Sequence, residues 1–365
     1  MTLRPAPGLA EAAELLLVRL PLVRPFTTSF GTTSVKEAIV VRAIGSDGVE
    51  GWGECVAAEH PLYSAEWNAA AWAVLRDYLI PAALEGRPAG IRGHPMARAA
   101  LETAVLDLRL RRAGTGLAAH LGGIRDRVPC GVSLGIEERV EDLLEQVAAF
   151  AAAGYRRVKL KIEPGRDVDV VREVRSAFPD LPLTVDANAA YTPETVEAIV
   201  PFDELGLEYI EQPLAEDDLV GHAALQRRLE TPLCLDETIT SATVARGALE
   251  VGACRVINIK VGRVGGLRGA VAIHDLARDA GVPVWCGGML ETGIGRAANV
   301  AIASLPGFTM PGDTSASARY FERDLTEPFV VDADGTMAVP AGPGIGVEPL
   351  PDVLAEATVE RLTIR

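Results

Sequence analysis

Cysteine is scarce in this sequence of 365 residues, and its five copies lie far apart, at Cys55, Cys130, Cys234, Cys254 and Cys286. They form no CxxC pair, and most are embedded in apolar, strand-like runs. An odd number of widely spaced cysteines argues against a disulfide framework and against a zinc site. We therefore expect five reduced cysteines in the core.

Basic residues and long apolar runs are also in short supply. Lys and Arg total 35 against 50 Asp and Glu, a net charge of −15. Such an acidic surface repels phosphate backbones and anionic lipid, so we expect neither nucleic acid nor a membrane as a partner. The apolar run Leu15 to Val18 stops at Arg19, which makes it too short for a secretory signal or a membrane span. We therefore expect a cytoplasmic protein.

What the sequence does contain is enough apolar residues for a large core: 48% are hydrophobic and 23% are charged. Within residues 1–125, two strands are expected around Ser46-Asp47-Gly48, and helices are expected over 64–84 and 94–113. This pattern predicts an α+β domain over residues 1–125, followed by a second domain over residues 126–325 and a C-terminal segment over residues 326–365.

After residue 125, short apolar runs alternate with helical patterns. The runs are VPCGVSL, RVKLKI, LTVDA, LEYIEQP, PLCLDET, VINIK, PVWCGG and FTMPGD. One intervening helix is expected to begin at Thr192, with Pro193 at its first helical position. A strand followed by a helix, repeated many times, predicts a sheet of parallel strands.

Charged residues recur at a regular interval along these runs. Lys161, Asp186, Glu211, Asp236 and Lys260 follow one another at steps of 25, 25, 25 and 24 residues. A strand, a helix and two short loops need about 25 residues. A similar step extended in both directions ends near Ser133, Gly287 and Asp313, which makes eight strand ends. The spacing therefore predicts an α/β fold with a (β/α)8-type (modified TIM) barrel rather than a doubly wound sheet.

The stretch RRVKLKI, residues 156–162, places Lys159 and Lys161 on one face of a strand. Barrel strands are covered on both sides, so these lysines need the mouth at the carboxyl ends of the strands. A helix cap or a surface ion pair explains any single acid about equally well. Three acids on consecutive strands repel one another unless a cation lies between them, and carboxylates without Cys or His favour Mg²⁺ or a similar ion. The pattern indicates a metal site flanked by two candidate bases.

The same motifs resemble those of the enolase superfamily, in its muconate lactonising subgroup. They are KLK (159–161), VDAN (185–188), EQP (211–213), DET (236–238) and NIK (258–260). Three further segments are similar to the o-succinylbenzoate synthase and N-succinylamino acid racemase group: KVGRVGG (260–266), GGMLETGIGRAAN (287–299) and PGDTSASARYF (311–321).

The resemblance implies that residues 1–125 form an α+β capping domain, that residues 126–325 form the catalytic barrel, and that residues 326–365 pack back on the cap. It also implies a metal-dependent enzyme that removes a proton α to a carboxylate and forms an enediolate. It implies Mg²⁺ or Mn²⁺ held by Asp186, Glu211 and Asp236, with Lys161 and Lys260 as catalytic groups on opposite faces of the α-carbon. The implied reactions are racemisation of an N-succinylamino acid, dehydration of a succinyl-cyclohexadiene carboxylate to o-succinylbenzoate in menaquinone biosynthesis, or both. The expected partner is thus a small carboxylate substrate, and association into a homo-oligomer is expected.

Further residues are expected to support this site. Lys159 is expected to lower the pKa of Lys161, as Arg263 could do for Lys260. The other expected supporting or substrate-binding residues are Asn188, Glu237, Ser133, Gly288, Met289 and Asp313. Helix capping or a tight turn explains several of them equally well.

The resemblance implies that the polar loop at residues 27–34 closes over the mouth, where Phe26 and Phe30 would suit the non-reacting part of the substrate. The alternative is an ordinary surface loop. The five histidines, His60, His94, His120, His222 and His274, are expected to be structural.

Other functions remain open from the sequence. Within the same chemistry, the alternatives are a dipeptide epimerase and a muconate cycloisomerase. A Schiff-base aldolase also places a lysine in a barrel mouth, but it needs no set of three acids. A non-catalytic ligand-binding protein is the alternative from another class, and it has no reason to keep two opposed lysines.

Overall fold

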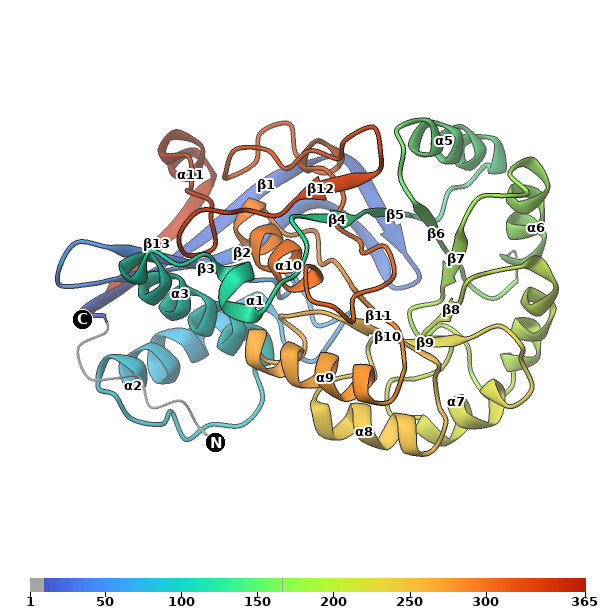
Figure 1. Ribbon diagram of the computed structural model, residues 1–365, viewed down its shortest axis with the longest axis horizontal. Helices are drawn as coiled ribbons and strands as arrows, with labels where there is room; N and C mark the ends of the chain where they lie inside the picture. Colours follow the sequence, from blue (N-terminus) through green and yellow to red (C-terminus); the bar gives the residue numbers. More distant parts are fainter. Residues whose placement is uncertain (1–9, 166) are drawn as a thin grey trace.

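The computed structural model describes residues 10–165 and 167–365. Figure 1 shows an antiparallel sheet with its helices on one side of the molecule, and a curled parallel sheet flanked by helices on the other. The predicted α/β architecture of a cap and a barrel is confirmed.

The antiparallel sheet has the strand order β13-β1-β2-β3. Its strands are β1 (Ala12–Thr28), β2 (Gly31–Ile44), β3 (Glu50–Cys55) and β13 (Thr358–Ile364). β1 was not anticipated because its apolar residues are consecutive instead of alternating. Leu15 packs in the core of the cap and Leu16 in the core of the barrel, so the strand is buried on both faces.

Two helical segments cover the cap sheet, close to the predicted ranges. The first runs through α1 (Asn68–Val74), a π-helical turn η1 (Leu75–Leu79) and α2 (Ile80–Leu84), and the second is α3 (Pro95–Ala113). α3 packs closely on β3, where a Cβ atom at Gly53 would lie 2.8 Å from the backbone nitrogen of Ala104. Glycine is therefore required for this contact.

The parallel sheet has the order β11-β10-β9-β8-β7-β6-β5, so each strand pairs with its neighbour in the sequence. The strands are β5 (Gly131–Leu134), β6 (Arg157–Lys161), β7 (Leu183–Asp186), β8 (Ile210–Glu211), β9 (Leu233–Leu235), β10 (Val256–Ile259) and β11 (Val284–Cys286). The α-helices beside them are α5 (Val140–Ala152), α6 (Asp167–Ala177), α7 (Leu219–Gln226), α8 (Ala242–Glu250), α9 (Leu267–Asp279) and α10 (Gly293–Ala303).

The eighth position of the barrel differs from the prediction of a regular strand. Residues 308–313 make only isolated parallel bridges. Phe308 pairs with Val284 in β11, and Gly312 pairs with Cys130, which directly precedes β5. The segment therefore lies between the two ends of the seven-stranded sheet and closes the ring. Pro311 lacks a backbone N–H and limits strand pairing there.

The helix expected at Thr192 and Pro193 also differs from the prediction. The segment is a 3₁₀ helix, η2 (Val196–Leu205), that contains Pro201. The Thr192 carbonyl accepts the Val196 N–H at 2.8 Å, whereas the Thr192 hydroxyl donates to Glu194 at 2.7 Å. Thr192 therefore opens the turn before the helix.

The chain returns from the barrel to the cap near its C-terminus. β12 (Thr336–Ala338) pairs with β4 (Arg127–Pro129), which follows α4 (Leu117–Leu121). η3 (Ser317–Arg319) precedes β12, and α11 (Pro351–Ala357) leads into β13, which pairs antiparallel with β1. The domain boundaries at residues 125 and 325 stay predictions.

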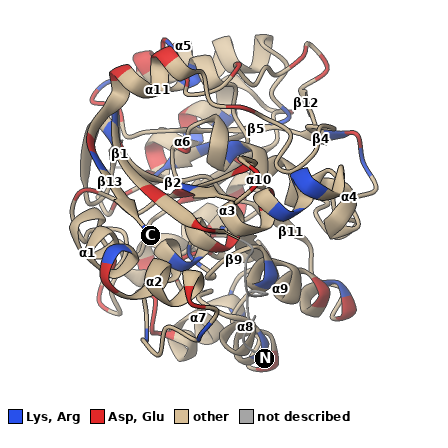
Figure 2. Cartoon of the chain, turned by 90° about the vertical axis from the view of Figure 1, so that its left-hand side faces the viewer, with Lys and Arg blue, Asp and Glu red and all other residues tan. Residues whose placement is uncertain are grey.

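The five cysteines are buried and free, as expected. Within residues 10–165 and 167–365, no helix is long and apolar enough to cross a membrane. Figure 2, in which the left-hand side of Figure 1 faces the viewer, shows acidic and basic residues interspersed along the chain.

Candidate active site

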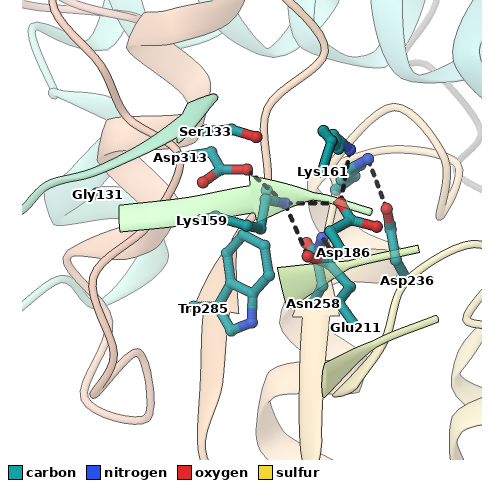
Figure 3. A network of polar contacts seen from close by, with 12 residues as sticks. Gly131, Ser133, Lys159, Lys161, Asp186, Glu211, Asp236, Asn258, Trp285 and Asp313 are labelled. Carbon is teal, nitrogen blue, oxygen red and sulfur yellow. Dashed lines mark hydrogen bonds and ion pairs between the residues drawn. The ribbon is translucent and has the colours of Figure 1, made fainter. Parts of the chain in front are cut away.

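The carboxyl ends of the parallel strands meet at one mouth, and Figure 3 shows charged side chains from several strands gathered there. The charged residues at the mouth are Lys159 and Lys161 from β6, Asp186 from β7, Glu211 from β8, Asp236 after β9, Lys260 after β10, and Asp313 after residues 308–312. Parallel pairing places Lys161 opposite Asp186, and Asp186 opposite Glu211. The structure thus brings together residues that are far apart in the sequence.

Lys159 lies deepest among the lysines of β6, with 2% of its side chain exposed. Its ammonium contacts three carboxylates, those of Glu211 at 2.7 Å, Asp313 at 2.9 Å and Asp186 at 3.0 Å. Burial opposes the charge, but these carboxylates outweigh it and raise the pKa of Lys159 well above its ordinary value. Lys159 is therefore a fixed positive charge. Its predicted effect on the pKa of Lys161 stays a prediction.

Lys161 lies two residues further along the same face of β6, where 8% of its side chain is exposed. Its Nζ donates to Asp186 Oδ2 at 2.6 Å and to Asn188 Oδ1 at 2.5 Å. Asn188 in turn donates from Nδ2 to Glu237 Oε1 at 2.8 Å. Asn188 thus orients Lys161 and connects it to Glu237, whose Oε2 is buried without a hydrogen-bond partner among the described residues.

Lys260 lies at the end of β10, four strands from β6 in the sheet. Its Nζ donates to Asp236 Oδ2 at 2.7 Å and lies 4.4 Å from the centre of the Tyr63 ring. The other Asp236 oxygen accepts from Arg263 and, at 3.2 Å, from the Tyr63 hydroxyl. Tyr63 belongs to the cap, so this end of the site is shared by both parts of the molecule.

The three candidate metal ligands, Asp186, Glu211 and Asp236, are completely buried. Lys159 and Lys161 overcome the effect of burial and hold the pKa of Asp186 well below its usual range. Burial and the charge of Asp186 raise the pKa of the neighbouring Glu211. The pKa values of these two adjacent carboxylates are therefore shifted in opposite directions.

The chemistry of these three acids fits a hard divalent cation, because all the donors are carboxylate oxygens. In the arrangement described, however, the carboxylates face ammonium and guanidinium groups. Among the described residues, no three His, Cys, Asp or Glu side chains are placed to hold a metal ion. Metal binding by Asp186, Glu211 and Asp236 therefore stays a prediction.

The backbone around the mouth is strained at the ends of three strands. Asn188 (φ 44°) and Ala189 (φ 60°) follow β7, Gln212 (φ 36°) follows β8, and Leu290 (φ 55°) follows β11. Residues other than glycine pay roughly 1–3 kcal/mol for such conformations, and they cluster at functional sites. Gln212 is buried and accepts the N–H of Asp236 at 3.0 Å, which fixes the loop that carries this acid.

A cavity of about 610 Å³ lies over the mouth, between the barrel and the cap. Its barrel wall includes the predicted substrate contacts Ser133, Gly288, Met289 and Asp313. The hydroxyl of Ser133 is buried and has no hydrogen-bond partner among the described residues, so it is available to a ligand. Asp313 is paired with Lys159 and with Arg157, which suggests that it positions Lys159 as well as lining the cavity.

The cap supplies the opposite wall of this cavity. Its apolar part includes Phe26, Phe30, Val35 and Leu62. Residues 27–34 form the tip of the β1-β2 hairpin rather than a free loop, with Thr27 paired to Thr32. His60 also lines the cavity from the cap, and the structural role expected for the histidines stays a prediction.

Two residues of the site were missed by the sequence analysis. Asn258 donates from Nδ2 to Glu211 Oε1 at 2.7 Å, and it lies two residues before Lys260 on the same face of β10. The alternation that relates Lys159 to Lys161 could have identified it. Gly287 makes room for this amide, because a Cβ there would lie 2.7 Å from Asn258 Nδ2. Tyr63 carries no such signal, since only the tertiary fold brings it to Lys260.

Comparisons with known proteins place both parts of the chain in one family. Residues 12–122 match the mandelate racemase / muconate lactonizing enzyme N-terminal domain, and residues 142–353 match the family described as enolase C-terminal domain-like. A member of the enolase superfamily from Enterococcus faecalis has a solved structure with a TM-score of 0.89. It is 42% identical, and the match covers 97% of this chain and 98% of that one.

Two curated relatives are similar over almost their whole length. An N-succinylamino acid racemase from Amycolatopsis is 53% identical, over 97% of this chain and 99% of the relative. An o-succinylbenzoate synthase from Geobacillus kaustophilus is 52% identical, over 93% of each chain. The predictions of the fold and of an enolase-superfamily enzyme are confirmed. The chain belongs to the mandelate racemase / muconate lactonizing enzyme family of the enolase superfamily.

Proposed function

We propose that this enzyme racemises N-succinylamino acids by removing and returning the proton α to the carboxylate. The observation that carries the proposal is the placement of Lys161 and Lys260 four strands apart, each beside a different carboxylate of the buried acidic set. The relative from Amycolatopsis bears the name of this activity.

In this mechanism the two lysines work on opposite faces of the α-carbon. One takes the α-proton on its Nζ, and the other delivers a proton from the opposite side, which inverts the centre. Asn188 orients Lys161 through the contact at 2.5 Å, and Tyr63 supports Lys260 from the cap. Lys159 keeps its proton and contributes fixed positive charge beside Glu211 and Asp186.

Asp186, Glu211 and Asp236 are the residues that would hold Mg²⁺ or Mn²⁺. A divalent cation bound there supplies positive charge next to the substrate carboxylate, which makes the adjacent C–H bond more acidic. The β1-β2 hairpin of the cap contacts the barrel beside this site, because Ser29 Oγ donates to the Ala187 carbonyl at 3.4 Å.

Dehydration to o-succinylbenzoate is a second candidate activity of the same site, favoured by the 52% identity to the Geobacillus synthase. Both reactions begin with removal of a proton α to a carboxylate. In the dehydration, the electron pair left on the α-carbon forms a double bond as hydroxide leaves the β-carbon, and a protonated lysine can supply the proton that makes it water.

Exchange of the α-proton with solvent deuterium tests the racemase mechanism directly. Lys161→Ala is expected to lose exchange with one enantiomer of an N-succinylamino acid, and Lys260→Ala with the other. Both variants should lose racemisation, by about a thousandfold or more, because each lacks one of the two acid/base groups. Deuterium incorporation is followed by proton NMR for each pure enantiomer.

Arg42→Gln is a suitable control, since Arg42 lies outside the cavity and pairs with Glu14 and Glu50 on the cap sheet. It should exchange both enantiomers. Equal loss for both enantiomers in both alanine variants would rule out the two-base arrangement.

A further inference from the structure

Lysine has an unusual distribution in this chain. Only four of the 35 basic residues are lysines, and the others are arginines. All four lysines, Lys36, Lys159, Lys161 and Lys260, line the same cavity. The barrel supplies three of them to the reaction site. Lys36 lies on β2 in the cap, and the proposed mechanism gives it no role.

Lys36 is 5% exposed, although it carries a charge. Its Nζ donates to the carbonyl oxygens of Met289 at 3.1 Å and Val56 at 3.5 Å. No carboxylate of the described residues forms an ion pair with it. Buried ammonium groups are normally paired with an anion, so this arrangement is incomplete.

The other cations of the cavity are already paired. Lys159, Lys161 and Lys260 each contact at least one acid, and Arg19 contacts Glu37 at 3.0 Å. Lys36 is therefore the one lysine or arginine in the cavity lining for which the described residues provide no carboxylate partner.

The charge of Glu54 interacts with that of Lys36, but both oxygens of Glu54 accept hydrogen bonds from Thr292 or Gly295. One accepts the Thr292 hydroxyl at 2.7 Å and the Gly295 N–H at 2.9 Å, and the other accepts the Thr292 N–H at 3.2 Å. These bonds attach β3 to the start of α10. An ammonium has three donors, and Lys36 uses two, so one donor remains for a ligand.

We propose that Lys36 binds the terminal carboxylate of the substrate's acyl group and so selects N-acyl groups that end in an anion. This inference rests on the proposed function, in which the substrate carries two carboxylates. The first belongs at the acidic, metal-binding end of the mouth. The second needs its own cation, and the unpaired ammonium in the same cavity meets that need.

The position of Lys36 agrees with this assignment. Its partner Met289 follows Gly288, and both residues line the cavity beside the mouth. A cavity of about 610 Å³ falls within the size range of pockets that bury most of the surface of a small ligand. A lysine also suits a single carboxylate oxygen, because its ammonium is compact, whereas arginine presents a wide planar fork.

The test compares three acyl groups on one amino acid: N-succinyl, N-succinamoyl and N-butanoyl. The last two lack the terminal charge. Lys36→Gln keeps an N–H donor for the Met289 carbonyl but removes the positive charge. We expect the wild type to prefer the succinyl group over the succinamoyl group by about tenfold or more in kcat/KM, as a charge-assisted hydrogen bond allows.

In Lys36→Gln this preference should disappear, mainly through a higher KM for the succinyl substrate. Its kcat/KM for the butanoyl substrate should stay within about threefold of wild type. Lys36→Arg should keep part of the preference, because it keeps the charge. Arg42→Gln is the matched control on the same strand, and its acyl preference should equal that of the wild type.

The outcomes separate this inference from the proposed function. If the wild type exchanges N-succinylamino acids and Lys36→Gln retains the full succinyl preference, the Lys36 proposal alone is overturned. An equal loss for all three acyl groups means that Lys36 only ties the cap to Met289, which also overturns it. If the wild type exchanges none of the three substrates, the proposed function fails and takes this inference with it.

Discussion

The two walls of the cavity are built in opposite ways. On the barrel wall, buried carboxylates and ammonium groups contact one another at 2.6–3.0 Å, and the ends of β7, β8 and β11 carry strained backbone. On the cap wall, Phe30 at the hairpin tip and Leu62 after β3 present apolar side chains that are 37% and 57% exposed.

This difference separates the chemistry from the selection of the substrate. Charges held by rigid strands keep their positions while a proton moves, which lowers the reorganisation needed in the transition state. An apolar wall on a hairpin tolerates changes in shape, so it can suit different substrates without disturbing the reacting groups. Substitutions in the barrel wall should therefore lower kcat, and those in the cap wall should raise KM.

The largest expected effect is the loss of the metal from the barrel wall. Exhaustive chelation should reduce turnover by about a thousandfold or more, and Mg²⁺ or Mn²⁺ should restore it. Glu211→Gln should weaken Mg²⁺ binding, measured by calorimetry, and reduce kcat to a similar extent.

The Glu211→Gln variant should still fold, because Lys159 keeps its contacts with Asp186 and Asp313. Circular dichroism checks this point. Wild-type turnover in protein shown to contain no metal would contradict the assigned role of the acids.

A smaller effect is expected at the hairpin tip. Phe30→Ala should raise KM for an N-succinylamino acid by about three- to thirtyfold, because the apolar contact of this ring with the substrate is lost. The value of kcat should change by less than about threefold. Val220→Ala on α7, where the side chain is 78% exposed and lies outside the cavity lining, is the control. A fall in kcat at constant KM would show that the two walls do not divide the work as proposed.

The last effect falls on stability rather than on kcat or KM, and it concerns Glu54, which joins the two walls. Burial raises the pKa of Glu54 from its ordinary 4.5 to about 7, against the opposing charge of Lys36. The folded protein therefore holds this proton at a higher pH than the unfolded chain does. The resulting stabilisation is complete below pH 4.5 and is lost as the pH rises towards 7, by about 3 kcal/mol in total.

Glu54→Gln has no carboxyl group to titrate at this position. Its free energy of unfolding should therefore fall less than that of the wild type between pH 4.5 and 7. Urea unfolding of both proteins across this range isolates the difference, since the other groups titrate alike in each. Parallel curves would mean that Glu54 is not protonated in the folded protein at pH 6.

Much of the barrel could be predicted because its chemistry is periodic. The 25-residue step from Lys161 to Asp186 and Glu211 located the ends of successive strands, and alternation along β6 related Lys159 to Lys161. The resemblance to the enolase superfamily then predicted the roles of these residues in metal binding and proton transfer.

The cap contribution could not be predicted in the same way. Tyr63 and Lys36 reach the site from segments without a repeating pattern, and only the packing of β2 and the following chain against the barrel brings them there. The prediction of a regular strand at the eighth position of the barrel was also wrong. The spacing of charged residues carries no information about Pro311, which limits strand pairing there.

The pairing of β13 with β1, from Ala13 opposite Ile364 to Val18 opposite Thr358, has a consequence for how the molecule is made. Each strand of the parallel sheet pairs with the strand synthesised just before it, so the barrel can assemble as the chain emerges. The cap sheet cannot acquire its edge strand until almost the whole chain has been synthesised. β1, which packs against both cores, therefore waits with one edge unpaired, and its contacts of high sequence separation are expected to form late and slowly.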